Sequence, residues 1–104
     1  MRNRAEQIAE LVGLPALLEG AAEECTELAK ACLKLSRKLR GENPTPMTMV
    51  DLTANLNEEL ADVSLCMEVL RIANAFDTQK IEEIYAAKEK RWYERLAETN
   101  KEVK

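Results

Sequence analysis

The 104-residue chain contains no histidine, and only 4% of its residues are aromatic. The missing imidazole excludes general catalysis by histidine, zinc sites built on histidine, and the Glu-x-x-His ligands of di-iron bundles. Any chemistry must therefore use carboxylates, amines or thiols. Glycine and proline are also scarce, with three of each, whereas 33% of the residues are charged. Together with abundant Ala, Leu, Glu and Lys, this composition favours one all-α domain.

The chain also lacks an excess of positive charge and a long apolar run. Its 15 basic and 19 acidic residues give a net charge of −4, so no global field draws it to nucleic acid or to an anionic membrane. The longest uncharged runs, such as 11–18, are far shorter than the ~20 residues of a membrane span. No signal-peptide pattern opens the sequence. We therefore expect a cytoplasmic protein that binds neither nucleic acid nor membranes.

The three cysteines, Cys25, Cys32 and Cys66, are odd in number and form no Cys-x-x-Cys pair. They lie among leucines and alanines in helical patterns. We therefore predict reduced core residues, and prefer this interpretation to a redox or metal-binding role.

Capping signals and apolar periodicity place the first two of four predicted helices. Asn3 is a candidate cap for a short helix that ends at Gly13. Pro15 fits the first turn of a second helix, which ends before Gly41. In this second helix, apolar residues recur at spacings of three and four, at Leu14, Leu18, Ala21, Cys25, Leu28, Cys32, Leu35 and Leu39. Such a row predicts the face that packs against a neighbouring helix.

A segment with two prolines, 42–47, predicts a loop before the third helix. Thr48 and Asp51 resemble a capping box that opens this helix, which ends near Asn74, and Asp77 is a candidate cap for the last helix. The packing row of the third helix is predicted at Leu52, Leu56, Leu60, Val63, Met67 and Leu70. The last helix carries one apolar stripe, at Ile81, Ile84, Tyr85, Trp92 and Leu96.

The third helix carries a second apolar row, largely opposite the first, at Ala61, Leu65, Val69 and Ile72. A helix that is apolar on two sides is buried on two sides, and a chain this small buries only ~60–65% of its unfolded surface. We therefore predict an antiparallel bundle of about four helices, completed by homo-oligomerisation. The alternative is that the short first helix folds back over this row. Residues 1–104 form a single predicted domain, with its core at about 14–96 and a tail that frays after 99.

Two acidic motifs, Glu-Glu-x-x-Glu on the second helix and Glu-Glu-x-x-Asp on the third, hold equivalent positions relative to the apolar rows. Residues three apart lie ~60° from one another around a helix, so Glu24 with Glu27, and Glu59 with Asp62, project as pairs. If the two rows pack together, the four carboxylates meet. Carboxylates that meet raise one another's pKa values and destabilise the fold unless a cation lies between them. Hard oxygen ligands favour Mg²⁺ or Mn²⁺ over zinc or copper.

The residues one turn away from these acids are small or neutral, namely Gly20, Ala31, Asn55 and Cys66. They leave room for a ligand. Farther along the second helix, Lys34 and Lys38 are two cations positioned to meet phosphate groups. The alternative is an ordinary solvated face, because acidic pairs arise often by chance in a chain with 19 acidic residues, and Glu27 with Lys30 has the spacing of a surface ion pair.

The acidic motifs resemble the signature of the MazG-like, all-α nucleoside triphosphate pyrophosphohydrolases, and the resemblance covers roughly 14–95. The order of helices and an Ala-Asp-Val run in the third helix are similar too. The resemblance implies that Glu24, Glu27, Glu59 and Asp62 coordinate Mg²⁺, or Mn²⁺ in its place. It also implies hydrolysis of a (deoxy)nucleoside triphosphate to the monophosphate and pyrophosphate, in house-cleaning or nucleotide-pool control. Members of the family act as dimers or dimers of dimers, with the site lined across subunits.

The chain departs from the family pattern at two points. The connection of 31 residues between Glu27 and Glu59 is longer than usual, and Trp92 stands where asparagine is common. For Trp92 we prefer a core position to a base-stacking one. Relatives often carry basic residues in the last helix, where this chain has Lys88, Arg91 and Arg95.

Roles in the implied reaction follow from the chemistry of the side chains. A carboxylate that is not fully used by metal can orient the attacking water as general base, and Glu27 is the first candidate and Glu23 the second. The candidates for substrate binding are Lys34, Lys38, Asn55, Lys88 and Arg91. Spacing does not choose between attack at the α- and the γ-phosphorus, so release of pyrophosphate rests on the resemblance.

Two alternatives to an active enzyme remain open. The first is a non-catalytic helical interaction or regulatory module, whose acids only solubilise a face of the protein. The second keeps the fold and the metal but has lost catalysis, and the altered position at Trp92 is the feature that supports it.

Overall fold

The structure is a computed structural model, which describes residues 2–42 and 46–103. It contains the helices α1 (Arg4–Val12), α2 (Leu14–Arg40), α3 (Met49–Ile72) and α4 (Thr78–Val103), and the described residues include no strand. The prediction of an all-α fold with four helices is therefore confirmed. None of the helices, as far as they are described, combines the length and the apolar character needed to cross a membrane.

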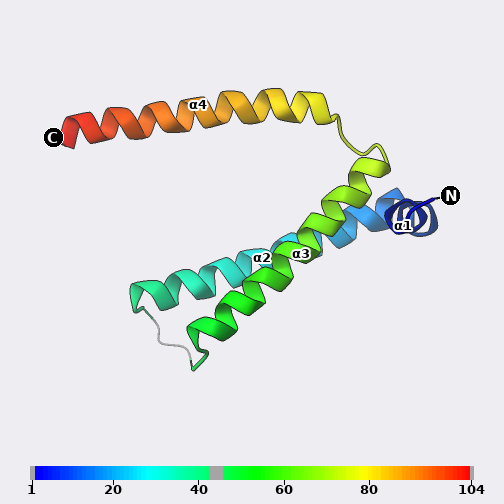
Figure 1. The fold of residues 1–104 in the computed structure, drawn as a ribbon, viewed down its shortest axis with the longest axis horizontal. Helices are drawn as coiled ribbons and strands as arrows, with labels where there is room; N and C mark the ends of the chain where they lie inside the picture. The colour runs from blue at the N-terminus through cyan, green and yellow to red at the C-terminus, as the bar shows by residue number, and fades with distance from the viewer. Residues whose placement is uncertain (1, 43–45, 104) are drawn as a thin grey trace.

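In space, α2 and α3 form an antiparallel pair, α1 lies across the end of this pair, and α4 returns over the pair as a separate arm (Figure 1). Contacts join α2 to α3, and α1 to both of them. The small buried core therefore lies between α2 and α3, and it includes Leu52, Val69 and Leu70 of α3.

The helix ends are fixed by local hydrogen bonds. Asn3, Thr48 and Asp77 each accept, through the side chain, a hydrogen bond from the backbone N–H three residues later, at 2.8, 3.1 and 3.1 Å. Each bond satisfies a donor that has no partner within its helix. Gly13 and Gly41 end α1 and α2 with φ of +88° and +72°, a region of φ that favours glycine. The predicted caps are confirmed.

Two predictions concern the segments between and after the helices. The loop predicted at 42–47 is confirmed for its described residues, while 43–45, with Pro44, lie outside them. The helix α4 extends to Val103, and the fraying of the tail after 99 stays a prediction.

The face that α2 presents to α3 differs from the predicted row. Within that row, Leu14, Leu18, Cys25, Cys32 and Leu39 are exposed, so the prediction is wrong for these residues. The buried or half-buried row is turned by about 50° around the helix, shares three residues with the predicted row, and consists of Leu17, Ala21, Glu24, Leu28, Ala31 and Leu35.

The reason for this difference is the size of the side chains at the contact. Because α2 is apolar over a wide arc, periodicity alone permits two neighbouring rows. Ala21 and Ala31 are small, and the distance between two packed helices depends on the side chains between them. Both alanines are almost fully buried, so the row with small residues is the one that packs.

The second apolar row of α3 is covered only at one end. Val69 is buried and Ile72 is half-buried near the end of α3 where α1 lies (Figure 1). Leu65 and Ala61, farther along the row, are exposed. Helix α1 therefore covers the end of this row at Val69 and Ile72, and it leaves Ala61 and Leu65 exposed.

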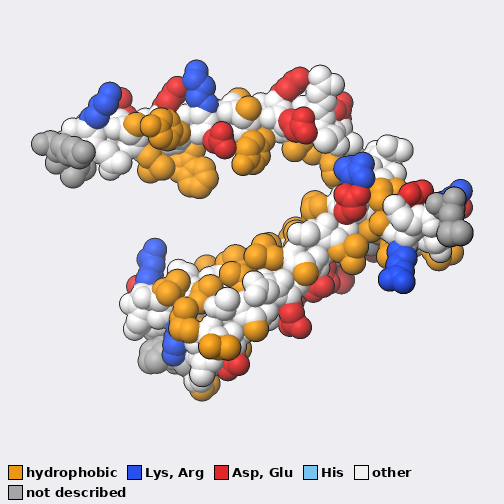
Figure 2. Space-filling model, viewed as in Figure 1, with side chains coloured by type: hydrophobic (Ala, Val, Ile, Leu, Met, Phe, Trp, Pro, Cys, Tyr) orange, Lys and Arg blue, Asp and Glu red, His pale blue; other side chains and the backbone are white. Residues whose placement is uncertain are grey.

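The apolar stripe of α4 is exposed along its whole length. Trp92 is 65% exposed, so its prediction as a core residue is wrong within this chain. The other stripe residues, Ile81, Ile84, Tyr85 and Leu96, are exposed as well. Figure 2 shows the hydrophobic side chains of α4 directed toward the α2–α3 pair across an open space. Completion of the bundle by a second subunit stays a prediction.

Candidate functional site

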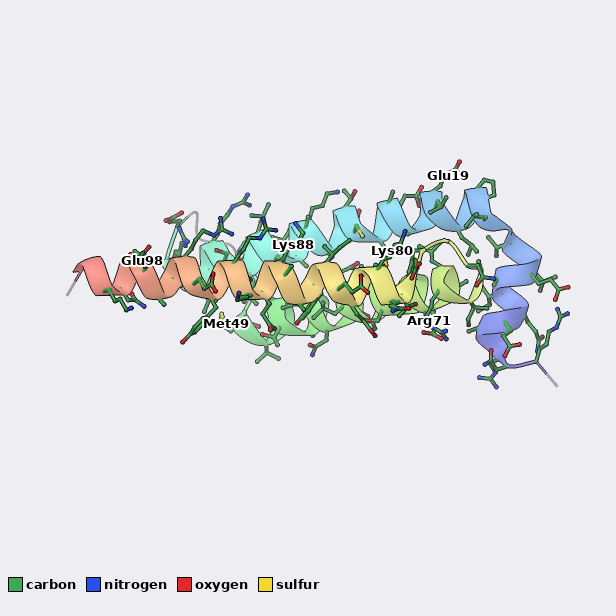
Figure 3. The ribbon with its side chains drawn as sticks, turned by 90° about the horizontal axis from the view of Figure 1, so that it is seen from above. Glu19, Met49, Arg71, Lys80, Lys88 and Glu98 are labelled. Carbon is green, nitrogen blue, oxygen red and sulfur yellow. The ribbon has the colours of Figure 1, made fainter. Side chains whose placement is uncertain are left out.

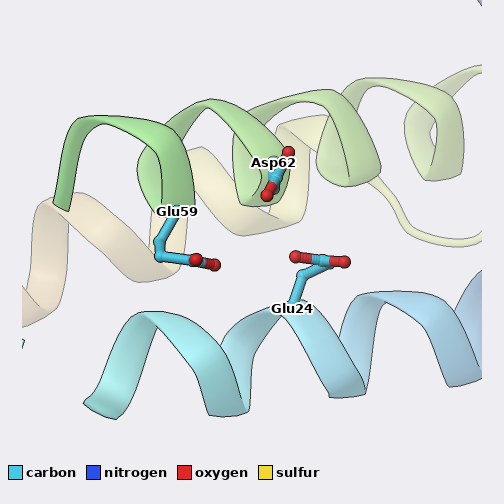
Figure 4. Close-up of side chains that lie close together, drawn as sticks. All are labelled: Glu24, Glu59 and Asp62. Carbon is cyan, nitrogen blue, oxygen red and sulfur yellow. The ribbon is translucent and has the colours of Figure 1, made fainter. Parts of the chain in front are cut away.

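Three of the four predicted metal ligands converge between α2 and α3. Glu24 of α2 and Glu59 and Asp62 of α3 each place one carboxylate oxygen within 4.8 Å of the others (Figure 4). We call these three residues the acidic cluster. Glu24 and Glu59 belong to the packed faces of their helices and are half-buried, while Asp62 is exposed at the edge. Helix packing therefore forces these carboxylates together.

The cluster is electrostatically strained. The pKa of the Glu24 carboxyl is raised from its ordinary value, first by burial and then by the neighbouring charges of Asp62 and Glu59 and a hydrogen bond with Asp62. Among the described residues, no hydrogen-bond partner faces the buried Oε2 atom of Glu59. A buried carboxylate oxygen without a donor is costly, and a cation bound between the acids would remove that cost.

The composition of the cluster limits which ion fits. Its three donors are carboxylates, so hard oxygen-binding ions such as Mg²⁺ and Mn²⁺ fit better than zinc or copper. The thiol of Cys66 lies near the cluster. Burial raises the pKa of this thiol, with further contributions from the charges of Glu24, Asp62 and Cys25.

The cysteines are free, but their predicted core positions are only partly correct. Cys66 is half-buried, whereas Cys25 and Cys32 are exposed. The prediction is wrong for these two residues because the contact face of α2 is rotated away from them.

The fourth predicted ligand, Glu27, is not part of the cluster. Its side chain is exposed, and its Oε1 atom accepts a hydrogen bond from Lys30 Nζ at 3.4 Å. Since Glu24 lies in the contact face, Glu27 falls at the rim of that face, three residues later. The ion pair expected between Glu27 and Lys30 is therefore present, and a functional role for Glu27 stays a prediction. Glu23, the other candidate base, is exposed on α2.

The substrate-binding candidates of the helix pair all lie toward the connection between α2 and α3, because they follow Glu24 along α2 or precede Glu59 along α3. Asn55 is half-buried on α3, one turn before Glu59. Lys34 is exposed on α2, and Lys38 is half-buried near its C-terminal end. All three belong to the same two helices as the acids.

The basic candidates of α4 are separated from the acids. Lys88 and Arg91 are exposed, and together with Trp92 and Arg95 they line a surface depression of about 390 Å³. In Figure 4 the three acids lie between α2 and α3, and α4 passes behind α3. Within one chain, the structure therefore does not bring Lys88 and Arg91 to the acidic cluster.

Sequence reasoning found the three clustered acids, but it missed that two of them lie inside the contact face. The signal was present in the row of Ala21, Glu24, Leu28 and Ala31, which has helical spacing and includes two small residues. Reading that row as the packing face excludes Glu27 from the set and keeps Glu24.

No family model, curated protein or solved structure matches this chain. Its function must therefore be inferred from the acidic cluster and from the resemblance of the motifs that supply it.

Proposed function

We propose that this protein is a Mg²⁺-dependent nucleoside triphosphate pyrophosphohydrolase of the MazG-like kind. It converts a (deoxy)nucleoside triphosphate to the monophosphate and pyrophosphate, as a cytoplasmic homo-oligomer that serves house-cleaning or nucleotide-pool control. The observation that carries the proposal is the convergence of Glu24, Glu59 and Asp62, because three of the residues that carry the motif resemblance meet in space.

Glu24, Glu59 and Asp62 would hold the ion. A bound Mg²⁺, or Mn²⁺ in its place, neutralises charge on phosphoryl oxygens and lowers the pKa of a bound water. The carboxylates themselves repel a triphosphate, so they position the ion and leave the binding of substrate to other residues. Two features of the acids support their role in holding the ion. The buried Glu59 oxygen has no hydrogen-bond donor among the described residues, and the pKa of Glu24 is raised by burial and by its acidic neighbours, so a cation bound between the acids would relieve both.

Glu27 is the first candidate for the general base. It lies at the rim of the cluster. Its ion pair with Lys30 is exposed, and an exposed ion pair contributes little free energy, so the carboxylate can exchange Lys30 for a water molecule at low cost. A carboxylate in this position accepts a proton as the water attacks. Glu23 is the second candidate.

Lys34, Lys38 and Asn55 are proposed to contact the substrate from the same helix pair. Lys88 and Arg91 lie on α4, which has no extensive contact with that pair. Their role as substrate contacts requires a second subunit, as the resemblance implies for a site lined across subunits.

The decisive experiment measures pyrophosphate released from a panel of nucleoside and deoxynucleoside triphosphates with Mg²⁺ present. Glu24→Gln and Glu59→Gln are expected to lower the rate by more than about 100-fold, because removal even of groups that only support a metal ligand costs about 10–100-fold. Glu58→Gln is the matched control, since Glu58 is exposed beside Glu59 and outside the cluster. Circular dichroism should show unchanged helicity in all three variants.

Undiminished activity in both cluster variants would remove these residues from the site. Release of orthophosphate in place of pyrophosphate would show attack at the γ-phosphorus and overturn the proposed bond cleavage.

The exposed stripe of α4 favours a second candidate, a non-catalytic helical interaction module. In that case no triphosphate in the panel would yield pyrophosphate with Mg²⁺ or Mn²⁺. The protein would also show no thermal stabilisation by either ion.

A further inference from the structure

Two aromatic rings lie open to solvent on one side of α4. Trp92, the single tryptophan of the chain, is 65% exposed, and Tyr85 is 66% exposed. Seven residues separate them, so both rings project from the same side of the helix, two turns apart. Large aromatic rings gain more from a covering surface than other side chains do. This side of α4 is therefore suited to a ligand with a flat ring.

Two surface depressions adjoin at Trp92. The first, which we call the aromatic depression, measures about 340 Å³ and is lined by Tyr85, Lys88, Glu89 and Trp92. The second is the depression of about 390 Å³ described above, which we call the cationic depression and which is lined by Lys88, Arg91, Trp92 and Arg95. Because Trp92 and Lys88 line both, one ligand can occupy the two depressions together.

The cations of the cationic depression have no carboxylate partner in the chain. Among the described residues, Lys88, Arg91 and Arg95 form no ion pair. By contrast, Lys90 lies outside both depressions, and its Nζ atom pairs with Glu94 Oε1 at 3.6 Å. Lysine and arginine side chains only donate hydrogen bonds, and guanidinium groups match the oxygens of phosphate well. The cationic depression therefore favours a ligand with several anionic oxygens.

The spacing of these residues along α4 fits a nucleotide. Lys88 lies in the middle stretch of the helix, between Lys80 and Glu98 (Figure 3). Trp92 follows Lys88 by four residues and precedes Arg95 by three, so the ring has a cation about one turn away in each direction. A ligand that places a flat ring on Trp92 and anionic oxygens one turn away has the chemistry of a base joined to phosphate groups.

We infer that the two depressions form a nucleotide subsite, in which a purine base stacks on Trp92 and the phosphate groups bind the three cations. The inference rests on the proposed function and assigns its substrate class, purine (deoxy)nucleoside triphosphates. It adds Trp92 and Arg95 to the residues that contact substrate, and it makes Trp92 the residue that determines base preference.

The preference for purines follows from the area of the rings. The indole of Trp92 and a purine are both fused two-ring systems, whereas a pyrimidine has one ring. Each further pair of atoms in contact adds dispersion energy, so a purine stacks on Trp92 over a larger area. Every base has a face that can stack, and differences in stacking strength give modest base preferences. Selection by Trp92 should therefore be graded and not absolute.

The first test measures binding without metal, where no turnover occurs. Purine monophosphates (GMP and AMP) and pyrimidine monophosphates (CMP and UMP) are titrated into the unsubstituted protein while the emission of Trp92 is recorded. We expect saturable quenching, with dissociation constants at least about 3-fold lower for the purines. Free N-acetyltryptophanamide at the same absorbance corrects for collisional quenching. Quenching that does not saturate, or that is equal for the two classes, contradicts the inference.

The second test compares two neighbouring aromatic residues in the pyrophosphate assay with Mg²⁺. Trp92→Ala should raise the KM for GTP by about 5- to 150-fold, which corresponds to the loss of one base–aromatic stack, and should remove the preference for GTP over CTP. Trp92→Phe should restore most of both. Tyr93→Ala is the matched control, because Tyr93 is 71% exposed and lies outside both depressions. Its KM values should be unchanged.

The third test compares two cations of α4. Arg95→Ala should weaken the binding of GMP by up to about 5-fold, the effect of one exposed charge pair. Lys90→Ala is the control, since Lys90 is already paired with Glu94 and lies outside both depressions. Equal binding of GMP by the two variants would place the phosphate elsewhere and contradict the inference.

Failure of the inference and failure of the proposed function give different results. Pyrophosphate release with equal KM values for GTP and CTP overturns the inference and leaves the function in place. Saturable quenching by GMP without pyrophosphate release from any triphosphate supports the subsite and overturns the function. If Trp92→Ala loses turnover of GTP and CTP equally, Trp92 has only a structural role, which contradicts the inference.

Discussion

The α2–α3 pair and the α4 arm consist of helices of similar length that differ in how their apolar faces are covered. The pair packs through a row that contains two alanines and a glutamate, and it holds Glu24 and Glu59 half-buried at its contact. The arm has a clearly segregated stripe with the single tryptophan, yet that stripe is exposed. A segregated apolar stripe is thus left without a neighbour in its own chain.

This difference shows that segregation of apolar residues and burial are separate properties. A segregated stripe specifies which side of a helix will be covered, while the partner is determined by the shape of the whole molecule. In the pair, small residues permit close approach, and close approach is what brings the acids together. The predictions below test the pair and the arm against each other.

The largest expected effect is on the core of the pair. Leu52 is 1% exposed, so Leu52→Ala should lower the free energy of unfolding by about 2–5 kcal/mol, measured by urea denaturation. Leu33→Ala is an exposed control that should stay within about 0.5 kcal/mol. Leu96→Ala, on the arm, should cost more than this control if a second copy covers α4. Equal values for Leu96→Ala and Leu33→Ala would mean that the arm is uncovered in solution.

Metal binding should stabilise the protein through the acidic cluster of the α2–α3 pair, and not through residues of α4. At a free Mg²⁺ concentration of 100 times Kd, linkage stabilises the fold by about 2.7 kcal/mol, which raises the melting temperature by several degrees in a domain of this size. Glu59→Gln should abolish the shift seen by calorimetry. Lys88→Ala, a change in a basic residue of α4, should preserve it, and a loss of the shift in Lys88→Ala alone would contradict an ion held by the acidic cluster.

The two capping residues allow a smaller and direct comparison. Thr48→Ala removes the cap of α3 and should cost about 1 kcal/mol in the free energy of unfolding, whereas Thr48→Ser should retain most of the cap. Asp77→Ala removes the cap of α4. If the arm is covered by a second copy, Asp77→Ala should lower global stability by a similar amount; an effect on helicity without one on stability would indicate an isolated arm.

The smallest expected effect is the pH dependence that the cluster contributes. Because the folded-state pKa of Glu24 is raised, the folded protein binds this proton more tightly than the unfolded chain does. The free energy of unfolding should therefore fall as pH rises from the ordinary value of 4.5 through the raised pKa. Melting curves without divalent ions should show this loss in the unsubstituted protein and less of it in Glu24→Gln. An unchanged pH profile in the variant would contradict the shift.

The helix boundaries were predictable because they depend on local chemistry. The caps at Asn3, Thr48 and Asp77 each involve a residue three positions away, and the stops at Gly13 and Gly41 depend on one backbone angle.

The candidate site was predictable only in part. Residues three apart project together from a helix wherever it packs, so the pairing of Glu59 with Asp62 followed from spacing. The choice of Glu24 over Glu27 did not, because it depends on the rotation of α2 about its own axis. That rotation was decided by the fit of Ala21 and Ala31 against α3.

By itself, the sequence determined four helices, their ends and the faces from which the acids project, because each of these depends on residues within one or two turns. Only the tertiary structure decided that Glu24, Glu59 and Asp62 meet, that Glu27 stays at the rim with Lys30, and that α4 leaves its stripe open. The physical reason is that packing depends on complementary shapes formed by residues far apart in the chain, which no local pattern encodes.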